Sequence, residues 1–213
     1  MNIVEIFYTS FHQPFSTEKW QYYLNKVPSA FQTRALRYLR WQDQHSSLLS
    51  HLLLQRGLLE AGYPAHCLNL LQHEKHGRPF IDSSLDFNLS HSGEYVVCAL
   101  FKSGRGGVDI EKMRPIEVSD FRSHMSLEEW SAITVPEVSY PKFFDYWTCK
   151  ESVMKADGRG LYIPLESILL QGPQALLEEK VWFLHKVEID SGYACHLATT
   201  WESLGVQLKE IKF

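Results

Sequence analysis

The sequence predicts an α+β fold. Helical and strand-like segments are interspersed along its 213 residues without the strand–helix–strand rhythm that builds a parallel sheet. The first third is rich in long helical patterns, whereas residues 168–213 alternate short β-rich runs with glycine turns. With 45% hydrophobic and 13% aromatic residues, the chain can bury a sizeable core.

The amino-terminal region is expected to begin with a strand at residues 1–8. Ser16 is placed to cap a helix that starts at Thr17. Residues 30–63 are strongly helical with one predicted break, and the second part of this stretch is apolar over a wide arc, as in a core helix. Gly62 is expected to end it.

The middle of the chain changes to short strands. A turn is predicted at residues 76–79, followed by strands near residues 80–81 and 87–93 and a central, fully apolar strand at residues 95–101. The glycine-rich turn at residues 104–107 leads into a further strand, which is expected to form a hairpin with the central one.

The remaining elements are two helices and the final strands. One helix is expected around residues 126–130, and a longer one spans residues 140–156 before Gly158 and Gly160 stop it. The strand-like runs that follow are separated by turns at residues 172–173 and 191–192.

Composition excludes several classes of function. A net charge of −4 argues against a general nucleic-acid or membrane-surface binder. No apolar run approaches the ~20 residues of a membrane span, and the first residues do not have the pattern of a secretory signal. The four cysteines lack the spacing of a zinc site or a disulfide scaffold, and Cys149 is interpreted as a packing residue. We therefore expect a cytoplasmic protein that binds neither nucleic acid nor membranes.

Four charged residues in two segments carry the chemistry. Asp109 and Glu111 are one residue apart on a predicted strand, so they point to the same side. Glu151 and Lys155 are four apart on a predicted helix and share a face. Glu151 also falls within an apolar stripe of that helix, formed by Phe143, Phe144, Trp147 and Met154.

A carboxylate in an apolar stripe costs several kcal/mol unless it has a partner. One interpretation is an ordinary Glu151–Lys155 ion pair beside a solvated strand end at Asp109 and Glu111. The other is that the three acids hold a hard cation such as Mg²⁺ next to a phosphate. The two segments taken together favour the cation.

Four sequence elements occur in a fixed order: His-Gly-Arg-Pro at residues 76–79, Asn-Leu-Ser-His at 88–91, Gly-Val-Asp-Ile-Glu at 107–111, and a Trp-x-x-Lys-Glu-x-x-x-Lys helix at 147–155. Through them the chain resembles the 4′-phosphopantetheinyl transferases, specifically the long, single-chain Sfp type. The resemblance implies two similar α/β halves in a pseudo-twofold arrangement, residues 1–105 and 106–213, with the active site between them. It also implies a monomer.

The resemblance further implies an activity. The family transfers the 4′-phosphopantetheine arm of coenzyme A to a serine of an apo acyl or peptidyl carrier protein and releases adenosine 3′,5′-bisphosphate. Mg²⁺ is the implied cofactor, with Asp109, Glu111 and Glu151 as its ligands. Glu151, or a water organised by Glu151 and Glu129, would take the proton of the attacking serine.

The resemblance assigns the remaining contacts to coenzyme A. Lys155, with Lys150, would neutralise the phosphoryl charge. The turn formed by Gly77, Arg78 and Pro79 would hold the adenine, and Ser90 and His91 would reach the 3′-phosphate.

Near the first long helix the family commonly offers two basic residues to the 3′-phosphate, whereas this chain has Phe31 and Arg34 at these positions. Arg37 could substitute, and Ser47 adds a hydroxyl. We therefore predict that the 3′-phosphate is recognised more weakly, or by different residues, than is usual in the family.

Two other functions share parts of this pattern. A coenzyme A-binding regulatory or partner protein would keep the pocket without transferring the arm, although the complete set of acids and lysine argues against it. A metal-dependent phosphohydrolase acting on a nucleotide would use the same carboxylates, and it would cleave coenzyme A without a carrier protein.

Overall fold

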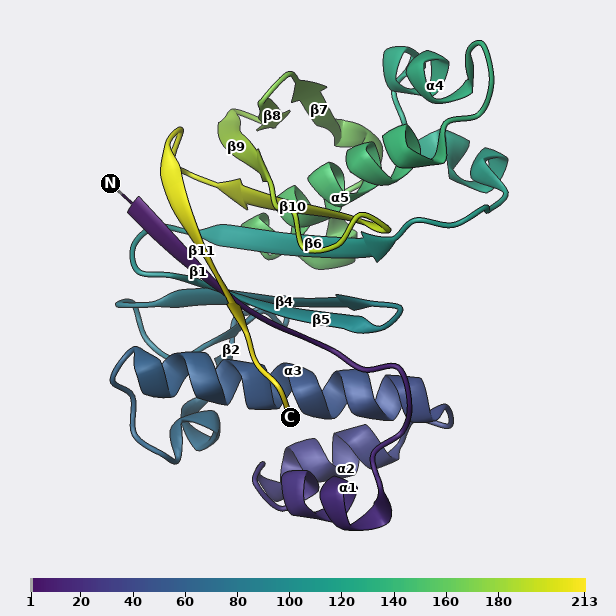
Figure 1. Ribbon diagram of the computed structural model, residues 1–213. Helices are drawn as coiled ribbons and strands as arrows, with labels where there is room; N and C mark the ends of the chain where they lie inside the picture. Colours follow the sequence, from purple (N-terminus) through teal and green to yellow (C-terminus); the bar gives the residue numbers. More distant parts are fainter. Residues whose placement is uncertain (1) are drawn as a thin grey trace.

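The computed structural model describes residues 2–213 and has four layers. Two sheets face each other in the middle of the molecule, with α3 covering the outer face of one and α5 that of the other (Figure 1). The mixed helices and strands confirm the α+β prediction. Within the described residues, no helix combines the length and apolar character needed to cross a membrane.

The first sheet has the strand order β11-β1-β5-β4. Its strands are β1 (Asn2–Ser10), β4 (Asp86–Ser92), β5 (Tyr95–Phe101) and β11 (Leu204–Glu210). β5 lies between β1 and β4, as predicted for a central apolar strand, and β11 runs parallel to β1. The last strand of the chain thus belongs to the first sheet, although it lies within residues 106–213 of the sequence. The division of the chain into two halves at residues 105 and 106 stays a prediction.

Three helices lie on the outer side of this sheet: α3 (Trp41–Glu60) packs on the sheet itself, and α1 (Thr17–Leu24) and α2 (Ser29–Leu36) pack on α3 (Figure 1). The Ser16 hydroxyl caps α1 by accepting a hydrogen bond from the Lys19 backbone N–H at 3.3 Å. α2 and α3 are separated by the predicted break. The leucines of α3 pack against Phe7, Phe87 and Leu100 of the sheet and form the first core.

A short connection then leads back to the sheet. It contains the 3₁₀ helix η1 (Cys67–Leu70) and the small hairpin of β2 (Gln72–His73) and β3 (Pro79–Phe80).

The second sheet has the order β6-β10-β9-β8-β7 and is antiparallel throughout. Its strands are β6 (Gly106–Lys112), β7 (Ile168–Gln171), β8 (Gln174–Leu177), β9 (Lys180–Lys186) and β10 (Tyr193–Thr199). The helices of this half are η2 (Val118–His124), α4 (Leu127–Thr134), α5 (Tyr140–Asp157), η3 (Gly160–Tyr162) and η4 (Leu165–Ser167).

Gly107 explains how closely α5 lies on β6. A side-chain carbon at Gly107 would overlap the backbone of Ser152 and Ala156 in α5, so only glycine allows this approach. At the other end of the helix, Gly158 adopts a left-handed conformation with φ of 93° and terminates α5 as predicted.

The inner faces of the two sheets form a further core. Val4 and Ile6 of β1 pack with Ile110 of β6 and Leu197 of β10, all with no exposed surface. This contact joins the two halves through apolar surface, which is the main stabilising contribution in such interfaces.

The predicted hairpin between residues 95–101 and the Asp109 strand is wrong. β5 pairs with β1 and β4, whereas β6 pairs with β10 in the other sheet. The glycine-rich turn therefore passes the chain from one sheet to the other. Hydrophobic alternation does not distinguish these two connections, because either leaves the apolar residues of β6 buried.

Candidate active site

Three carboxylates from two elements face one another beside the contact of α5 with β6. Asp109 and Glu111 come from β6, on the same face as Gly107, and Glu151 comes from α5. Burial, followed by the negative charge of Asp109, raises the pKa of Glu151 to about 7. Burial and the charge of Asp109 also raise the pKa of Glu111. The three acids are thus close enough for their charges to repel one another.

Lys155 binds this acid cluster through Asp109. Its Nζ donates to Asp109 Oδ1 at 2.6 Å and to Ser90 Oγ at 2.8 Å. Within the described residues Lys155 forms no ion pair with Glu151, so the ordinary intrahelical pair is not the arrangement found here. The other oxygen of the aspartate, Asp109 Oδ2, is buried and has no hydrogen-bond partner.

The acid cluster fits a hard cation in its chemistry. All its candidate ligands are carboxylate oxygens, their charges repel one another, and Asp109 Oδ2 is buried without a donor. However, in residues 2–213 no three His, Cys, Asp or Glu side chains are grouped so as to hold a metal ion by themselves. A cation bound here would need further oxygens from a ligand or water, which Mg²⁺ commonly uses.

A pocket of about 280 Å³ lies between α2, α3, the β2–β3 turn and β4. Its lining residues are Phe31, Arg34, Tyr38, Ser47, Ser50, His51, Leu54, Leu71, His73, Gly77, Pro79, Asn88, Leu89 and His91. Four of the predicted coenzyme A contacts lie together here with Gly77: Arg34, Ser47, Pro79 and His91. The Ser47 hydroxyl is buried and has no partner in the structure.

The wall of this pocket beside α3 is aromatic. The Phe31 and His51 rings lie 4.1 Å apart between centroids, tilted by 31°. His51 Nδ1 lies 2.7 Å from the Ser47 carbonyl oxygen, and burial lowers the pKa of His51. The wall is therefore uncharged and flat near neutral pH. Together with Arg34 at the rim, it suits a planar ligand that carries an anionic group.

The Ser90 side chain lies apart from that of His91. Its hydroxyl is buried, donates to Asp109 Oδ1 at 2.8 Å and faces the acid cluster, whereas its neighbour His91 lines the pocket. Adjacent side chains of a strand point in opposite directions, so Ser90 and His91 face different sides of β4. The Ser90 side chain is therefore directed to the acid cluster and not into the pocket, and its expected contact with a 3′-phosphate stays a prediction.

Lys150 and Glu129 are also placed elsewhere. The Lys150 side chain has no exposed surface, and its Nζ bonds Glu129 Oε2 at 3.0 Å and the carbonyls of Leu165 and Ile168 at 3.1 and 2.8 Å. Glu129 is buried and completes the capping box of α4 with Ser126. In this structure Lys150 is engaged by an ion pair and two carbonyls and Glu129 by the ion pair and the capping box, so the expected roles of both in phosphate and proton transfer stay predictions.

Arg78 is a structural residue as well. Its buried guanidinium binds Asp86 at 2.8 Å, the Gly106 carbonyl at 2.7 Å and the Lys155 carbonyl. The β2–β3 turn still borders the pocket through Gly77 and Pro79, but the Arg78 side chain points into the contact between the halves. Cys149 is buried as predicted, and burial raises the pKa of its thiol to about 12.

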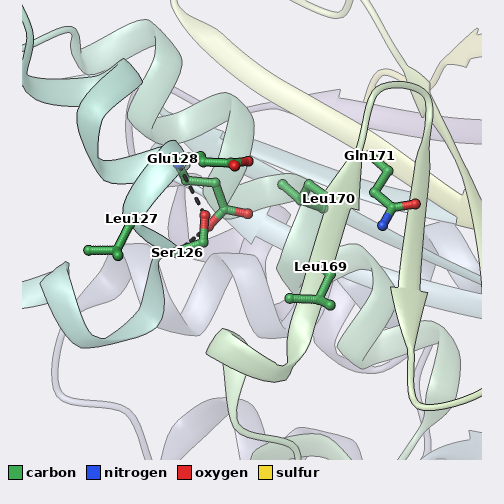
Figure 2. Close-up of a pocket in the computed structure, with 7 residues that line it drawn as sticks. Ser126, Leu127, Glu128, Leu169, Leu170 and Gln171 are labelled. Atoms are coloured by element: carbon green, nitrogen blue, oxygen red, sulfur yellow. Dashed lines mark hydrogen bonds between the residues drawn. The ribbon is translucent and has the colours of Figure 1, made fainter.

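A second pocket, of about 330 Å³, lies between the start of α4 and β7 (Figure 2). Its lining contains Glu128 and Glu129 but no lysine, arginine or histidine, so it does not suit an anionic ligand. Leu127 and Leu169 border it with exposed side chains (Figure 2).

Ser92 is a residue of the site that the sequence analysis missed. Its hydroxyl donates to Glu111 Oε2 at 2.6 Å. Every second residue of β4, from Asp86 to Ser92, is a short polar side chain. This alternation was the signal that one polar face of the strand meets the acid strand.

Comparisons with known proteins agree on one family. Residues 105–198 match the family described as the 4′-phosphopantetheinyl transferase superfamily, and residues 13–102 match that described as 4′-phosphopantetheinyl transferase, N-terminal. The chain is 26% identical over 210 residues to the 4′-phosphopantetheinyl transferase gsp of Aneurinibacillus migulanus, covering 95% of this chain and 88% of the relative.

Two relatives from Bacillus subtilis are also similar. The chain is 29% identical over 193 residues to the 4′-phosphopantetheinyl transferase Sfp of strain 168, covering 85% of both chains. It is 30% identical over 160 residues to another 4′-phosphopantetheinyl transferase of Bacillus subtilis, covering 73% of this chain and 70% of the relative.

Proposed function

The chain belongs to the 4′-phosphopantetheinyl transferase superfamily and is an enzyme of that class, and on this premise we propose its reaction. It transfers the 4′-phosphopantetheine arm of coenzyme A to a serine hydroxyl of an apo acyl or peptidyl carrier protein. The serine oxygen forms a bond to the β-phosphorus, the bond from that phosphorus to the bridging oxygen breaks, and adenosine 3′,5′-bisphosphate leaves.

The position of β4 carries this proposal. His91 on one side of the strand lines the pocket, while Ser90 on the other side bonds Asp109 of the acid cluster. A ligand whose nucleotide occupies the pocket can therefore extend its phosphates around β4 to the acids and Lys155. Coenzyme A has such a shape, with a pyrophosphate next to its nucleotide.

Asp109, Glu111 and Glu151 are the residues that would hold Mg²⁺. When bound, Mg²⁺ supplies charge neutralisation and orientation of the pyrophosphate, which are the main requirements of phosphoryl transfer. Lys155 is already held at Asp109 and partly exposed, so its ammonium can donate to a phosphate oxygen.

Glu151 is the candidate base, either directly or through a water molecule. Burial raises its pKa to about 7 without a cation, and a bound Mg²⁺ would lower it, so the carboxylate would be ionised near neutral pH. It also has no hydrogen-bond or ion-pair partner among the side chains of the described residues. The serine proton would move to its carboxylate as the phosphorus–oxygen bond forms.

The nucleotide would occupy the pocket. Its adenine would lie against the turn at Gly77 and Pro79, and Arg34 and His91 would donate to the 3′-phosphate. The Ser47 hydroxyl, which is buried without a partner, would add a further hydrogen bond. In this proposal the enzyme works as a cytoplasmic monomer, and its carrier protein supplies the serine.

Mass spectrometry of apo carrier proteins tests the reaction. Incubation with coenzyme A, Mg²⁺ and the enzyme should add one phosphopantetheine per carrier, and chelation of Mg²⁺ should stop it. Glu151→Gln should label poorly, while the matched control Glu128→Gln, which changes an exposed acid on α4, should label normally. Cleavage of coenzyme A without any carrier, or full labelling by Glu151→Gln, would contradict the proposal.

A further inference from the structure

The two sheets are joined at their edges by side chains. Four side chains of β4 each accept a hydrogen bond from a backbone N–H of β6, and each pair is separated by 20 residues in the sequence. The pairs are Asp86 with Gly106 at 2.9 Å, Asn88 with Val108 at 3.0 Å, Ser90 with Ile110 at 3.3 Å and Ser92 with Lys112 at 3.1 Å. We refer to these four side chains as the β4 ladder.

The β4 ladder fixes the register of the acid strand. β4 and β6 are edge strands of different sheets, so their backbones do not pair directly. The period of two places all four ladder residues on one side of β4, and the N–H groups that they meet are those of every second residue of β6. The ladder therefore fixes how β6, and with it Asp109 and Glu111, lies along β4.

The two serines of the ladder, unlike Asp86 and Asn88, also donate a hydrogen bond to an acid of β6. Ser90 accepts from the N–H that follows Asp109 and donates to Asp109 Oδ1 at 2.8 Å. Ser92 accepts from the N–H that follows Glu111 and donates to Glu111 Oε2 at 2.6 Å. A hydroxyl has one proton, so each serine gives that proton to one acid while its oxygen accepts from the backbone N–H of the next residue.

We propose that Ser92 is a positioning residue that holds the Glu111 carboxylate in the orientation needed to bind a divalent cation. This inference rests on the proposed function, because it concerns the acid cluster of that function. Only one oxygen of Glu111 is used by Ser92, so the other is left for a cation. Without the hydroxyl, the flexible glutamate side chain would have to be ordered by the cation itself, at a cost in rotamer entropy.

Ser92 is the better test of the ladder than Ser90. Ser90 Oγ also accepts from Lys155 Nζ at 2.8 Å, so replacing it changes two groups of the site. Among residues 2–213 the Ser92 hydroxyl forms hydrogen bonds with Glu111 and the Lys112 backbone N–H alone, and Ser92 does not line the nucleotide pocket.

The experiment measures cation binding without turnover. Free Mn²⁺ is followed by electron paramagnetic resonance as enzyme is added, with coenzyme A present and no carrier protein. Ser92→Ala should weaken Mn²⁺ binding about tenfold, as is typical when a residue that orients a metal ligand is lost. Ser92→Thr keeps the hydroxyl and suits a strand, so it should bind Mn²⁺ like the wild type.

Ser84→Ala is the matched control. The Ser84 hydroxyl donates to Asp82 at 2.6 Å, the same length as the Ser92–Glu111 bond, but lies outside the acid cluster. It should leave Mn²⁺ binding unchanged, and thermal unfolding of Ser92→Ala should match that of this control.

The outcomes separate the two proposals. If the wild type binds no Mn²⁺, the metal site of the proposed function fails and the role of Ser92 fails with it. If the wild type binds Mn²⁺ and Ser92→Ala binds it equally well, only the role of Ser92 is overturned. The same holds if Ser92→Thr is as weak as Ser92→Ala, because the hydroxyl would then not be what matters.

Discussion

Two lysine–carboxylate pairs lie on opposite flanks of α5, and they differ in whether polar atoms of the pair remain without a protein partner. In one, Lys150 and Glu129 lie 3.0 Å apart with side chains 0% and 7% exposed, and Lys150 also donates to two backbone carbonyls. In the other, Lys155 and Asp109 lie 2.6 Å apart, but Lys155 is 27% exposed and Asp109 Oδ2 has no partner.

This difference separates a structural pair from a reactive one. A buried pair whose hydrogen bonds are all satisfied holds elements together, here α4, α5 and the start of β7, and has nothing left for a ligand. A pair with an unpartnered oxygen and neighbouring acids keeps the capacity to bind a cation and a phosphate. We call the first the closed pair and the second the open pair.

The largest expected effect is the loss of activity at the open pair. Asp109→Asn keeps the size of the side chain but removes the charge that would hold Mg²⁺ and Lys155. Carrier labelling should fall about 10³-fold or more, which corresponds to about 4 kcal/mol of transition-state stabilisation. Stability should change little, because the like-charge repulsion with Glu151 is relieved at the same time.

The control for this prediction is a change of a partly exposed acid on α5, the helix that carries Glu151 and Lys155. Asp145→Asn alters α5 outside the acid cluster, where the carboxylate has only a 3.5 Å contact with exposed Lys186. It should label carrier protein at the wild-type rate. Equal labelling by Asp109→Asn and Asp145→Asn would remove the basis for the open pair.

The closed pair should show the reverse behaviour. Lys150→Met fills similar volume but leaves the Glu129 carboxylate buried without its cation, which typically costs about 3–5 kcal/mol of unfolding free energy. Denaturant unfolding measures this loss. Any Lys150→Met protein that remains folded should transfer the arm at a rate close to that of the wild type.

A double substitution sharpens this test. Glu129→Gln combined with Lys150→Met removes both charges, so stability should recover by part of the loss. The coupling between the two positions should be clearly non-zero in a double-mutant cycle. If Lys150→Met is stable but inactive, then Lys150 belongs to the active site and the distinction between the two pairs is wrong.

The sequence predicted the open pair better than the closed one. Asp109, Glu111, Glu151 and Lys155 occur at spacings that place them on defined faces of a strand and a helix, and periodicity alone can show that. Lys150 is one position before Glu151, but 100° per residue turns it to the other flank of α5. Its partner Glu129 lies on another helix, so only the tertiary contact shows that the pair is closed.

The fold shows the same limit. Most helices and strands were predicted, because each depends on local periodicity, caps and glycines such as Gly62 and Gly158. The placement of β6 was not, since a glycine turn between two strands usually makes a hairpin. The pairing of β11 with β1 joins residues far apart in the sequence, and no local pattern specifies it. The polar alternation of β4 shows that one face of the strand meets polar groups, but it does not show that β6 supplies them.

His196 forms a third polar contact with α5, and its imidazole should stay neutral at physiological pH. Its Nδ1 lies 2.7 Å from Thr148 Oγ1, and burial lowers its pKa from 6.5 to about 4. The charged groups that act on it are Asp145, Lys186 and Glu188. Between pH 6.5 and pH 4 the unfolded chain binds a proton at His196 that the folded chain does not bind. The contribution of neutral His196 to the free energy of unfolding is therefore complete above pH 6.5 and is lost as the pH falls towards 4.

The expected loss is up to about 3 kcal/mol across this pH window. Denaturant unfolding of the wild type and of His196→Gln from pH 7 to pH 4 measures it. The variant is less stable at pH 7, but its free energy of unfolding should fall by about 3 kcal/mol less than that of the wild type between pH 7 and pH 4. Other titrating groups contribute equally to the two proteins. If the free energies of unfolding of the two proteins fall in parallel with pH, the pKa of His196 is not lowered by folding.

The smallest expected effect concerns two arginines, of which one is buried with a protein partner and the other is exposed without one among residues 2–213. Arg78 is buried with its guanidinium bound to Asp86, whereas Arg34 is exposed at the pocket rim and forms no ion pair among residues 2–213. As the open arginine, Arg34 should contact the 3′-phosphate. Arg34→Ala should raise KM for coenzyme A about 5- to 10-fold, as expected for an exposed charge-assisted hydrogen bond of about 1–1.4 kcal/mol. KM for dephospho-coenzyme A, which lacks that phosphate, should not change.

Arg37→Ala and Arg56→Ala complete this comparison. Arg37 follows Arg34 by three residues and could share the phosphate, whereas Arg56 is paired with Glu60 on α3 and should have no effect. Because Phe31 adds no charge to the pocket, wild-type discrimination between the two coenzymes should be modest and should nearly vanish in Arg34→Ala. A large discrimination that survives Arg34→Ala would move phosphate recognition to His91, Ser47 or Arg37, and an exposed arginine at the pocket rim would then no longer indicate a ligand contact.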